Sequence, residues 1–511
     1  TFRAQTDGTD SIQDVDNGSG DLNVTFDGDG DGVPGGVYNY WFETRPVDRV
    51  LRFNSGGTAS LDTRIVTVTG GNGVVRRFEF SLDPIVGVGN TAVIFNSNST
   101  AGDLATALAN AINSRSELGV TAIANGTRVT LRGERLIQLS NGLTAIDLSG
   151  KTIFVDKSAG PNADGSLSKP FNNISGTGVA NAFAASVPGD IIRIVGNGGA
   201  DGKLETVEDN FAYEVGFGVL AGSVLSDGST MDVPKGVSVM VDAGAVFKMR
   251  RSRIGVGSST LGVDRSGGAL QVLGTPKLLD RNGNAIKSAD GSDVTGSVFF
   301  TSWLDQSIGL DNYAPNTVPA PGDWGGLVFK RDLDRSVGRF DLEDEGVFRQ
   351  YVNYADMRYG GSSSVVIDSV QQTVNTIQIA DMRPTVTFNR ITNAADSAMS
   401  ATPDSFEETL FSDVRFQRKG SFTPDYDRVG PEIHDNTLIN NSINGLFIKV
   451  STPAGGELKQ LTVPGRFNDT DIVHVISENI VVSGNPGGGL LDSTIAPSNL
   501  ISLSPSLGGS L

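Results

Sequence analysis

Acidic residues at every second position mark the stretch with the clearest potential for chemistry, "FDGDGDGVPGG" at residues 26–36. Asp27, Asp29 and Asp31 alternate with glycines, and three carboxylates gathered in one turn repel one another unless a cation lies between them. Oxygen ligands of this kind are those that Ca²⁺ prefers. We therefore predict a calcium site whose ligands are Asp27, Asp29, Asp31 and the backbone carbonyl of Val33.

The spacing of these aspartates matches only the beginning of an EF-hand loop. The three aspartates and Gly32 fit positions 1, 3, 5 and 6 of that loop, but Tyr38 stands at position 12, where an EF-hand has a bidentate Glu. No helix is expected on either side. Asn23, Glu43 or water would have to complete the coordination. We expect the ion to stiffen the backbone rather than to catalyse; the alternative is a solvated acidic turn.

A second acidic run, "KRDLDRSVGRFDLEDEGVF" at residues 330–348, mixes both signs of charge. Alternating charges along a loop are typical of a salt-bridged surface excursion, which is our prediction for this run. The acidic members are Asp332, Asp334, Asp341, Glu343, Asp344 and Glu345, and the basic members are Lys330, Arg331, Arg335 and Arg339.

Two further sets of residues are candidates for catalysis. Paired carboxylates can hydrolyse a glycosidic bond, and the candidates for such a pair are Asp356, Asp381, Asp396 and Asp435. They belong to different motifs, and the sequence does not show that they converge.

The only histidines, His434 and His474, both fall in expected strands, where we predict a packing role. A zinc site needs three or four ligands, and the chain has no cysteine to supplement two histidines. A Ser-His-Asp triad stays open, but no GxSxG motif nominates its serine.

Composition narrows the class of protein. The formal net charge of −18 argues against nucleic acid or an anionic membrane as a partner. No run of eighteen or more apolar residues is long enough to span a bilayer, so we expect no membrane insertion. The absence of cysteine excludes disulfides and thiolate chemistry. With 65 glycines and many Val, Ile, Thr, Asn and Asp residues, the chain is expected to be mainly β.

Four regions are expected along the chain. Residues 1–60 read as a β-rich, β-sandwich-like fragment that carries the Asp/Gly loop. Residues 61–148 predict a small α/β module in the order β-β-β-α-β-β, with Ser99 or Thr100 capping its helix. Residues 149–490 form the largest region, and residues 491–511 read as a linker or the start of a next unit of a longer parent chain.

The largest region has the pattern of a solenoid. Short apolar strands alternate with Gly, Asn and Asp turns, most clearly in "IHDNTLINNSINGLFI" at residues 433–448. Asparagine at a corner tolerates left-handed backbone and can bond to its neighbours, as a coil of parallel β-helix requires. Val179, Phe183 and Val187 follow helical spacing, which predicts a short helix that covers the open N-terminal end of the solenoid.

Residues 155–196 carry a family resemblance. "VDKSAGPNADGSLSKPFNNI", followed by an expected helix and "PGDIIRIVG", resembles the opening of pectate-lyase-like right-handed parallel β-helix domains. The combination with the acidic loop resembles large modular bacterial cell-surface and adhesin-type proteins. The resemblance implies a right-handed parallel β-helix and an extracellular location. Because β-helix lyases hold Ca²⁺ with clustered carboxylates and use Arg or Lys as the base, it also gives the run at 330–348 an alternative, catalytic interpretation.

From these patterns we expect a structural or adhesive segment of an extracellular cell-surface protein, stiffened by Ca²⁺. The expected partners are further copies in an oligomer or filament, surface glycans, or other cell-surface proteins. The alternatives are a polysaccharide-degrading β-helix lyase or hydrolase and a carbohydrate-binding module without turnover. No residue is assigned a catalytic role.

Overall fold

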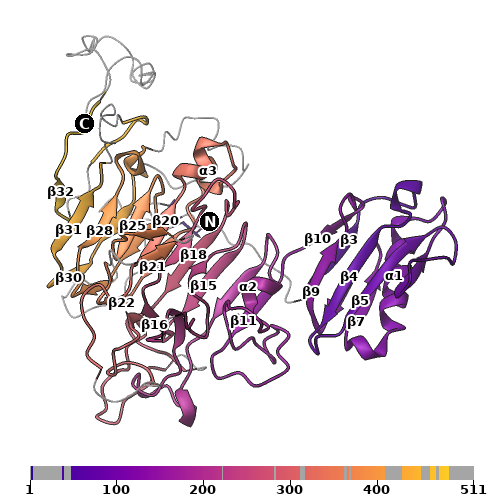
Figure 1. Cartoon of the computed structure of the whole chain (residues 1–511), viewed down its shortest axis with the longest axis horizontal. Helices are drawn as coiled ribbons and strands as arrows, with labels where there is room; N and C mark the ends of the chain where they lie inside the picture. The colour runs from indigo at the N-terminus through magenta and orange to yellow at the C-terminus, as the bar shows by residue number, and fades with distance from the viewer. Residues whose placement is uncertain are drawn as a thin grey trace. The chain divides into compact units, whose positions relative to one another are not determined.

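The computed structural model describes most of residues 48–482 and two short strands before them (Figure 1). The described residues are 2–3, 37–38, 48–220, 222–280, 284–310, 317–361, 365–367, 370–408, 428–450, 461–467 and 471–482. The strands β1 (Phe2–Arg3) and β2 (Val37–Tyr38) pair antiparallel. The predicted calcium ligands Asp27, Asp29, Asp31 and Val33 lie outside the described residues.

An α/β module forms from the first continuous stretch. Two four-stranded sheets, in the orders β10-β3-β8-β7 and β6-β5-β4-β9, enclose one core with the helix α1. The bounds are β3 (Val50–Phe53), β4 (Ile65–Gly70), β5 (Val75–Ser81), β6 (Asn90–Ile94), α1 (Ala101–Asn113), β7 (Thr121–Asn125), β8 (Arg128–Arg132), β9 (Glu134–Leu139) and β10 (Ile146–Leu148), with the 3₁₀ turns η1 (Ala59–Leu61) and η2 (Ser116–Leu118). The run from β4 to β8 has the predicted order β-β-β-α-β-β.

The helix α1 begins where its sequence predicts. The side chain of Thr100 accepts a hydrogen bond from the backbone N–H of Asp103, and the Asp103 carboxylate accepts one from the backbone N–H of Thr100. This reciprocal pair satisfies two N–H groups that a helix end leaves free. The stripe that includes Leu104, Leu108 and Ile112 is fully buried. The strand β3, which lies before residue 60, also contributes to this core through Leu51 and Phe53.

Three parallel sheets make up most of the remaining described chain (Figure 1). The first sheet contains β11 (Thr152–Val155), β12 (Ile191–Ile194), β15 (Ser238–Asp242), β18 (Ala269–Leu273), β21 (Tyr351–Asn353), β26 (Thr385–Thr387) and β29 (Glu432–His434). The second contains β13 (Tyr213–Gly216), β16 (Val246–Arg250), β19 (Val298–Ser302), β22 (Ala355–Arg358), β27 (Arg390–Thr392) and β30 (Thr437–Ile439). The third contains β14 (Met231–Asp232), β17 (Ile254–Val256), β20 (Leu327–Lys330), β25 (Ile377–Ala380), β28 (Ser397–Ala401), β31 (Ile443–Ile448) and β32 (His474–Ile476).

The chain visits these three sheets in rotation. The strands β15, β16 and β17 follow one another in sequence and lie in the first, second and third sheets, and β18, β19 and β20 pair in parallel with them in the same order. We call one such set of three strands a pass. The chain is therefore mainly β, as its composition predicts, and its sheets are parallel, as the strand and turn pattern of residues 149–490 predicts. Each pass lies against the one before it.

Shorter elements lie between the strands. They are the helices α2 (Ala182–Ala185) and α3 (Asp332–Ser336), the 3₁₀ turns η3 (Gly199–Asp201), η4 (Leu342–Glu345) and η5 (Pro403–Phe406), and the antiparallel hairpin of β23 (Val365–Ile367) and β24 (Val370–Gln372).

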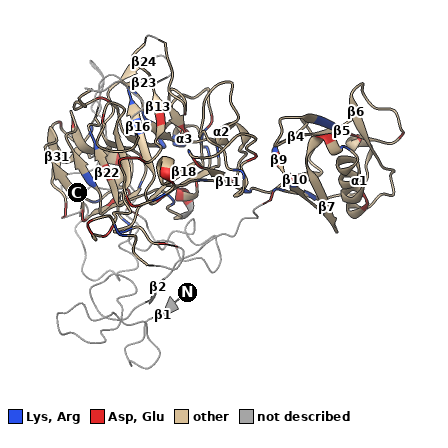
Figure 2. Ribbon diagram, turned by 90° about the horizontal axis from the view of Figure 1, so that it is seen from below, with Lys and Arg blue, Asp and Glu red and all other residues tan. Residues whose placement is uncertain are grey.

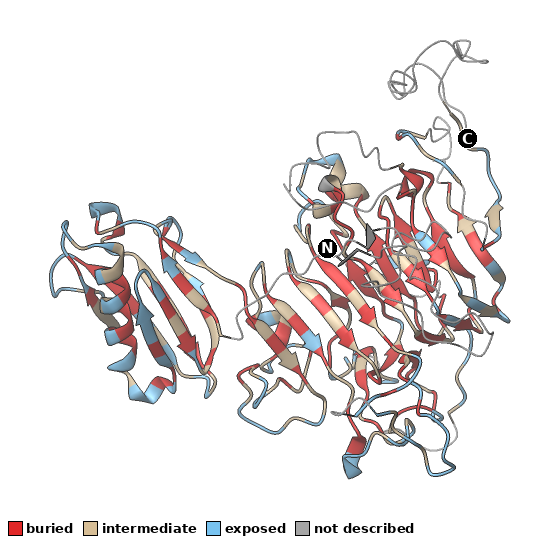
Figure 3. Cartoon of the chain, turned by 180° about the vertical axis from the view of Figure 1, so that it is seen from behind, coloured by how far each residue is buried: buried red, intermediate tan, exposed pale blue. Residues whose placement is uncertain are grey.

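The interior between the sheets is filled by apolar side chains from alternate strand positions. Buried residues recur along the strands (Figure 3). Tyr213, Phe247, Phe300 and Trp324 are fully buried, and their rings follow one another with centroids 5.3, 4.9 and 6.3 Å apart. Offset stacking at such distances adds to the stabilisation that burial of the rings provides. The same register that pairs the strands therefore also stacks their inward side chains from pass to pass.

Asparagines bond one pass to the next at the corners, as their punctuation of the sequence predicts. Asn389 Oδ1 accepts from the backbone N–H of Ala355 at 2.8 Å, and Asn389 Nδ2 donates to Asn436 Oδ1 at 2.9 Å. Asn393 and Asn440 have φ angles of 57° and 56°, in the left-handed region that asparagine tolerates.

The first edge strand is covered by a loop rather than by a long helix. Backbone hydrogen bonds join Phe154 to Gly165 and Phe171, on the side of β11 that lacks a neighbouring strand. The predicted helix over 179–187 is wrong in extent, since α2 has a single turn that begins at its N-cap Asn181. Val179 is exposed, because the residues that α2 buries are the small Ala182 and Ala185.

Candidate functional site

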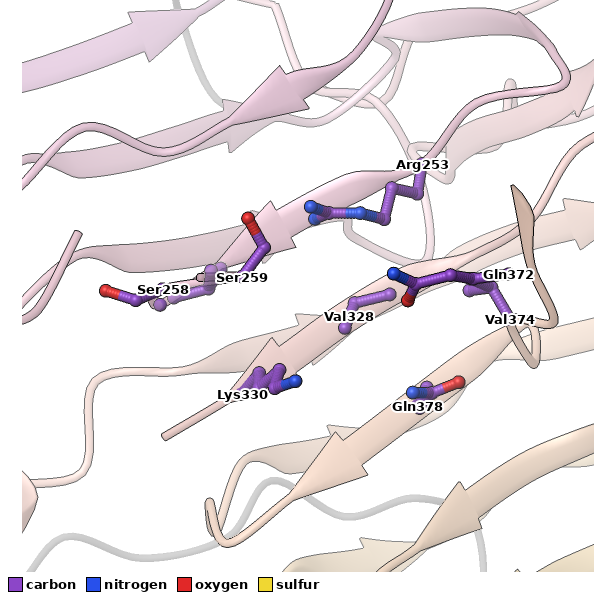
Figure 4. A pocket seen from close by; sticks show the side chains of 10 residues that line it. Arg253, Ser258, Ser259, Val328, Lys330, Gln372, Val374 and Gln378 are labelled. Carbon is purple, nitrogen blue, oxygen red and sulfur yellow. The ribbon is translucent and has the colours of Figure 1, made fainter. Parts of the chain in front are cut away.

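A polar pocket opens on the outer face of the third sheet, between β17, β20 and β25 and the hairpin β23–β24. Figure 4 shows Arg253 and Ser259 on one side, Lys330 and Gln378 on the other, and Val328 and Gln372 between them. The remaining lining residues are Val256, Gly257, Ser258 and Val374. Its volume of about 40 Å³ is small beside the roughly 300–1,000 Å³ of sites that enclose a whole small molecule. It can hold one small group.

Strand register places the pocket residues. Gly255 pairs with Val328, which pairs with Gln378, so these three form one outward row across β17, β20 and β25. Lys330 lies two residues after Val328 on the same face of β20. The hairpin covers the row from outside, where Val365 and Val374 pack against Val328 in a small apolar cluster of their own.

A glycine makes room for the buried cation of the pocket. A Cβ atom on Gly255 would lie 1.6 Å from Nη1 of Arg253, so a side chain at this position would displace the guanidinium from where it lies. Nη1 of Arg253 lies 2.7 Å from Oδ1 of Asp232, and Arg253 is only 3% exposed. Its Nε is buried and has no hydrogen-bond partner among the described residues. The buried Nε of Arg253 is therefore a donor without a described acceptor, on a guanidinium that is paired with Asp232 through Nη1.

Lys330 is the second cation, and its ion pair is loose. Nζ of Lys330 lies 3.6 Å from Oδ2 of Asp332, and its side chain is partly exposed. Burial raises the pKa of Asp332, while Lys330 opposes that shift. Oδ1 of Asp332 is buried without a described hydrogen-bond partner, which fits a carboxyl that takes up a proton readily. Lys330 thus keeps donor capacity toward the pocket.

A network of buried ion pairs lies beside this region, where a surface excursion was predicted. Asp334, Asp341 and Glu343 are 2–5% exposed, so the prediction of a surface run is wrong for them. Nε of Arg383, from a later pass, donates to Glu343 at 2.8 Å. These carboxylates can be buried because guanidinium groups from later passes pair with them. The sequence of residues 330–348 alone does not show that pairing.

An aromatic ring completes this network. The guanidinium groups of Arg383 and Arg428 lie 4.7 and 4.8 Å from the ring centre of Phe348. Burial opposes ionisation of Glu343, but Arg331, Arg383 and Arg428 together hold the pKa of Glu343 below its ordinary value. Asp341 differs, since burial and its neighbour Glu343 raise its pKa. The cluster has the features of a structural anchor, because its members bond to one another and lie almost out of reach of solvent.

The four carboxylates considered for hydrolysis occupy four different settings. Asp356 lies on the outer face of β22 and pairs with Arg358 at 2.8 Å. Asp381 follows β25 at a corner with φ of 55°, and Thr402 donates to it. Asp396 precedes β28 and accepts from the N–H of Ser397. Asp435 lies at the corner between β29 and β30. No contact described here brings any two of them together.

Both histidines lie in strands, as predicted. His434 contacts Phe388 edge-on, and its Nδ1 lies 2.8 Å from Oδ2 of Asp435. His474 packs beside Phe406 and Phe467, and burial lowers its pKa. Within the described parts of the chain, no three Asp, Glu or His side chains group as metal ligands.

Charges of both signs are interspersed over the described chain (Figure 2), and many form the ion pairs noted above. Among the helices that the structure describes, none combines the length and apolar character needed to cross a bilayer. Comparisons with protein-family models, curated proteins and solved structures found no match to this chain.

Proposed function

We propose that this chain is a structural and adhesive segment of an extracellular cell-surface protein, built on a right-handed parallel β-helix and stiffened by Ca²⁺ at the loop of Asp27, Asp29 and Asp31. The observation that carries the proposal is the rotation of strands among three parallel sheets, which repeats from β12 to β31 with only the hairpin β23–β24 inserted. A β-helix winds in this way, and parallel crossovers are almost always right-handed.

The physical properties of such a stack suit a structural role. Each pass buries its apolar side chains mainly by lying on its neighbours, so the stack lengthens without needing a larger core. Buried asparagine and ion-pair contacts join successive passes at the corners. The outer faces of the sheets are left to meet partners, either glycans, other surface proteins or further copies of the chain.

A polysaccharide-degrading enzyme is the alternative from the sequence. Paired-acid hydrolysis places its two carboxyl groups within about 10 Å of each other in one open groove. The settings of Asp356, Asp381, Asp396 and Asp435 described above give that alternative no support.

Antibody labelling tests the location and electron microscopy tests the form. We expect antibodies to the purified chain to label intact cells that make it, and the purified chain to appear as rods of constant width that associate at high concentration. Labelling only after lysis would contradict the extracellular role. Release of reducing sugar from a polysaccharide panel by the purified chain would replace the structural function with an enzymatic one.

A further inference from the structure

We propose that the pocket between the third sheet and the hairpin β23–β24 binds a tetrahedral oxyanion, the sulfate or phosphate group of a substituted saccharide. This inference deepens the proposed adhesive role by naming a ligand class, and in that respect it rests on the proposed function.

The lining of the pocket favours an anion. It contains Arg253 and Lys330 and no carboxylate, in a chain whose formal net charge is −18. The carboxylates nearest the pocket lie outside its lining, and one of them, Asp332, has its Oδ2 3.6 Å from Nζ of Lys330. Asp232 pairs with Arg253, and Asp334 accepts from Ser258 at 2.6 Å and from Arg339 at 3.0 Å. A group that enters the pocket therefore meets positive charge and neutral donors.

The arrangement of donors favours a tetrahedral group over a planar carboxylate. Arginine recognises a carboxylate best with two parallel N–H groups, but Nη1 of Arg253 already lies 2.7 Å from another carboxylate oxygen, Oδ1 of Asp232. The remaining donors approach separately from three strands: Arg253 precedes β17, Lys330 ends β20 and Gln378 lies in β25. The Nε2 of Gln378 has no hydrogen-bond partner among the described residues, while its Oε1 accepts from Asn375 at 3.4 Å. Single donors from several directions match the oxygens of a tetrahedron.

The size of the pocket fits one substituent and not a sugar ring. About 40 Å³ admits a single compact group, so the rest of a ligand would lie outside on the sheet. Gln372, which is exposed on the hairpin, offers its amide group to sugar hydroxyls there. The occupant is therefore expected to be an anionic substituent on a polar molecule.

Calorimetric titration of the purified full chain with sodium sulfate, against sodium chloride at matched ionic strength, tests the pocket. We expect saturable binding of sulfate and not of chloride. Lys330→Met removes one charged donor at a partly exposed position, and we expect it to weaken sulfate binding at least about tenfold. Lys235→Met is the matched control, since Lys235 pairs with Asp264 and does not line the pocket; it should bind as the wild type does.

A second measurement covers the case in which Lys330→Met fails to fold. Acetylation of wild-type Lys330 by an amine-reactive reagent, followed by mass spectrometry, should slow in sulfate relative to chloride, whereas acetylation of Lys235 should not. Equal heats in sulfate and chloride, or equal protection of Lys330 and Lys235, would overturn the proposal.

Three saccharides distinguish the sources of the oxyanion. Glucose 6-sulfate and glucose 6-phosphate are expected to compete with inorganic sulfate, and the one that binds more tightly identifies the substituent. Glucose is expected not to compete. Competition by glucose alone would show that sugar hydroxyls rather than an oxyanion occupy the pocket, and would overturn the inference. A chain that binds sulfate but labels only lysed cells would contradict the proposed function and leave the pocket intact.

Discussion

Glu343 illustrates how this fold stabilises a charge inside a protein. The carboxylate is 3% exposed, yet its pKa is held below the ordinary value because Arg331, Arg383 and Arg428 surround it. Removal of one partner of a buried ion pair is costly, since it leaves the other charge without compensation. The arginines come from several passes, so this single residue joins segments that are far apart in the sequence.

We therefore expect Glu343→Gln to lower the free energy of unfolding by about 3 kcal/mol at pH 7. The folded-state pKa of Glu343 lies below its ordinary 4.5, so its contribution is fully present above about pH 4.5 and is lost as the pH falls through the folded-state pKa. The difference between variant and wild type should narrow in acid, which denaturant titrations at neutral and acid pH would measure.

Glu117→Gln provides the control for this prediction. Glu117 pairs with Arg76 on the surface of the α/β module, and both side chains are well exposed. Exposed pairs contribute little, so this variant should have nearly wild-type stability at neutral pH. If Glu343→Gln showed the same small effect at neutral pH, the network would not be an anchor.

Asn436 is the second residue whose role can be measured directly. Its Oδ1 accepts from the backbone N–H of Asn389, and its Nδ2 donates to Val386 at 2.7 Å. Asn436→Ala leaves those partners unsatisfied and should cost about 1–3 kcal/mol in thermal or chemical unfolding. Thr437→Ala, an exposed position on the next strand, should change stability far less. Equal effects of the two substitutions would show that the corner bonds do not join the passes.

At the scale of elements, the helices and strands that could be predicted are those whose sequence signals lie within one short stretch. The helix α1 has its cap, its acidic first turn and its apolar stripe within one short stretch, so its cap could be narrowed to Ser99 or Thr100, and the structure has Thr100. The strands with β-branched residues between glycines were predicted for the same reason. The hairpin β23–β24 was missed, because its exposed half ends in glutamines and it packs on Val328 from a different pass.

The candidate site was less predictable than the fold. Arg253 and Lys330 come to line one pocket only through strand register, and Gly255 matters only because the side chain of Arg253 lies over it. The run at 330–348 was expected at the surface, since its buried partners Arg383 and Arg428 lie in later passes. Contacts between passes depend on which strands pair and in what register, and the local pattern of apolar and turn residues does not give that register.

Thr100→Ala tests the local origin of α1. Loss of the cap should lower stability by about 1 kcal/mol, because the N–H of Asp103 loses its acceptor. Thr106→Ala is the matched control within the same helix, where alanine is the better helix former and Thr106 is exposed. Thermal unfolding followed by circular dichroism would measure both. A Thr106→Ala variant as destabilised as Thr100→Ala would contradict the capping role.

At the scale of the whole molecule, calcium is the condition that would change stability most widely. A ligand that binds only the native chain raises the free energy of unfolding, by about 2.7 kcal/mol at one hundred times its dissociation constant. We expect a chelator to lower the thermal midpoint of the wild-type chain and to have no effect on Asp29→Ala.

Asp290→Ala supplies the comparison for the calcium prediction. Asp290 lies in an exposed turn, where hydrogen bonds from Ser288 and Ser292 lower its pKa to about 2. This variant should keep the full response to the chelator. A wild-type midpoint that does not move with chelator would rule out a stabilising ion.

The rotation of strands also bears on how such a chain can change over generations. Ser238 and Ala269 are paired neighbours in the first sheet, and so are Gln271 and Tyr351, although the second pair is separated by more than twice as much chain. The pairing register of two strands does not depend on the length of the connection between them, provided that the chain returns to the same position in the sheet. Insertions and deletions at the corners are therefore tolerated far better than a one-residue shift within a strand. Related chains could thus differ in their corner loops, and in what those loops bind, while the paired strands stay the same.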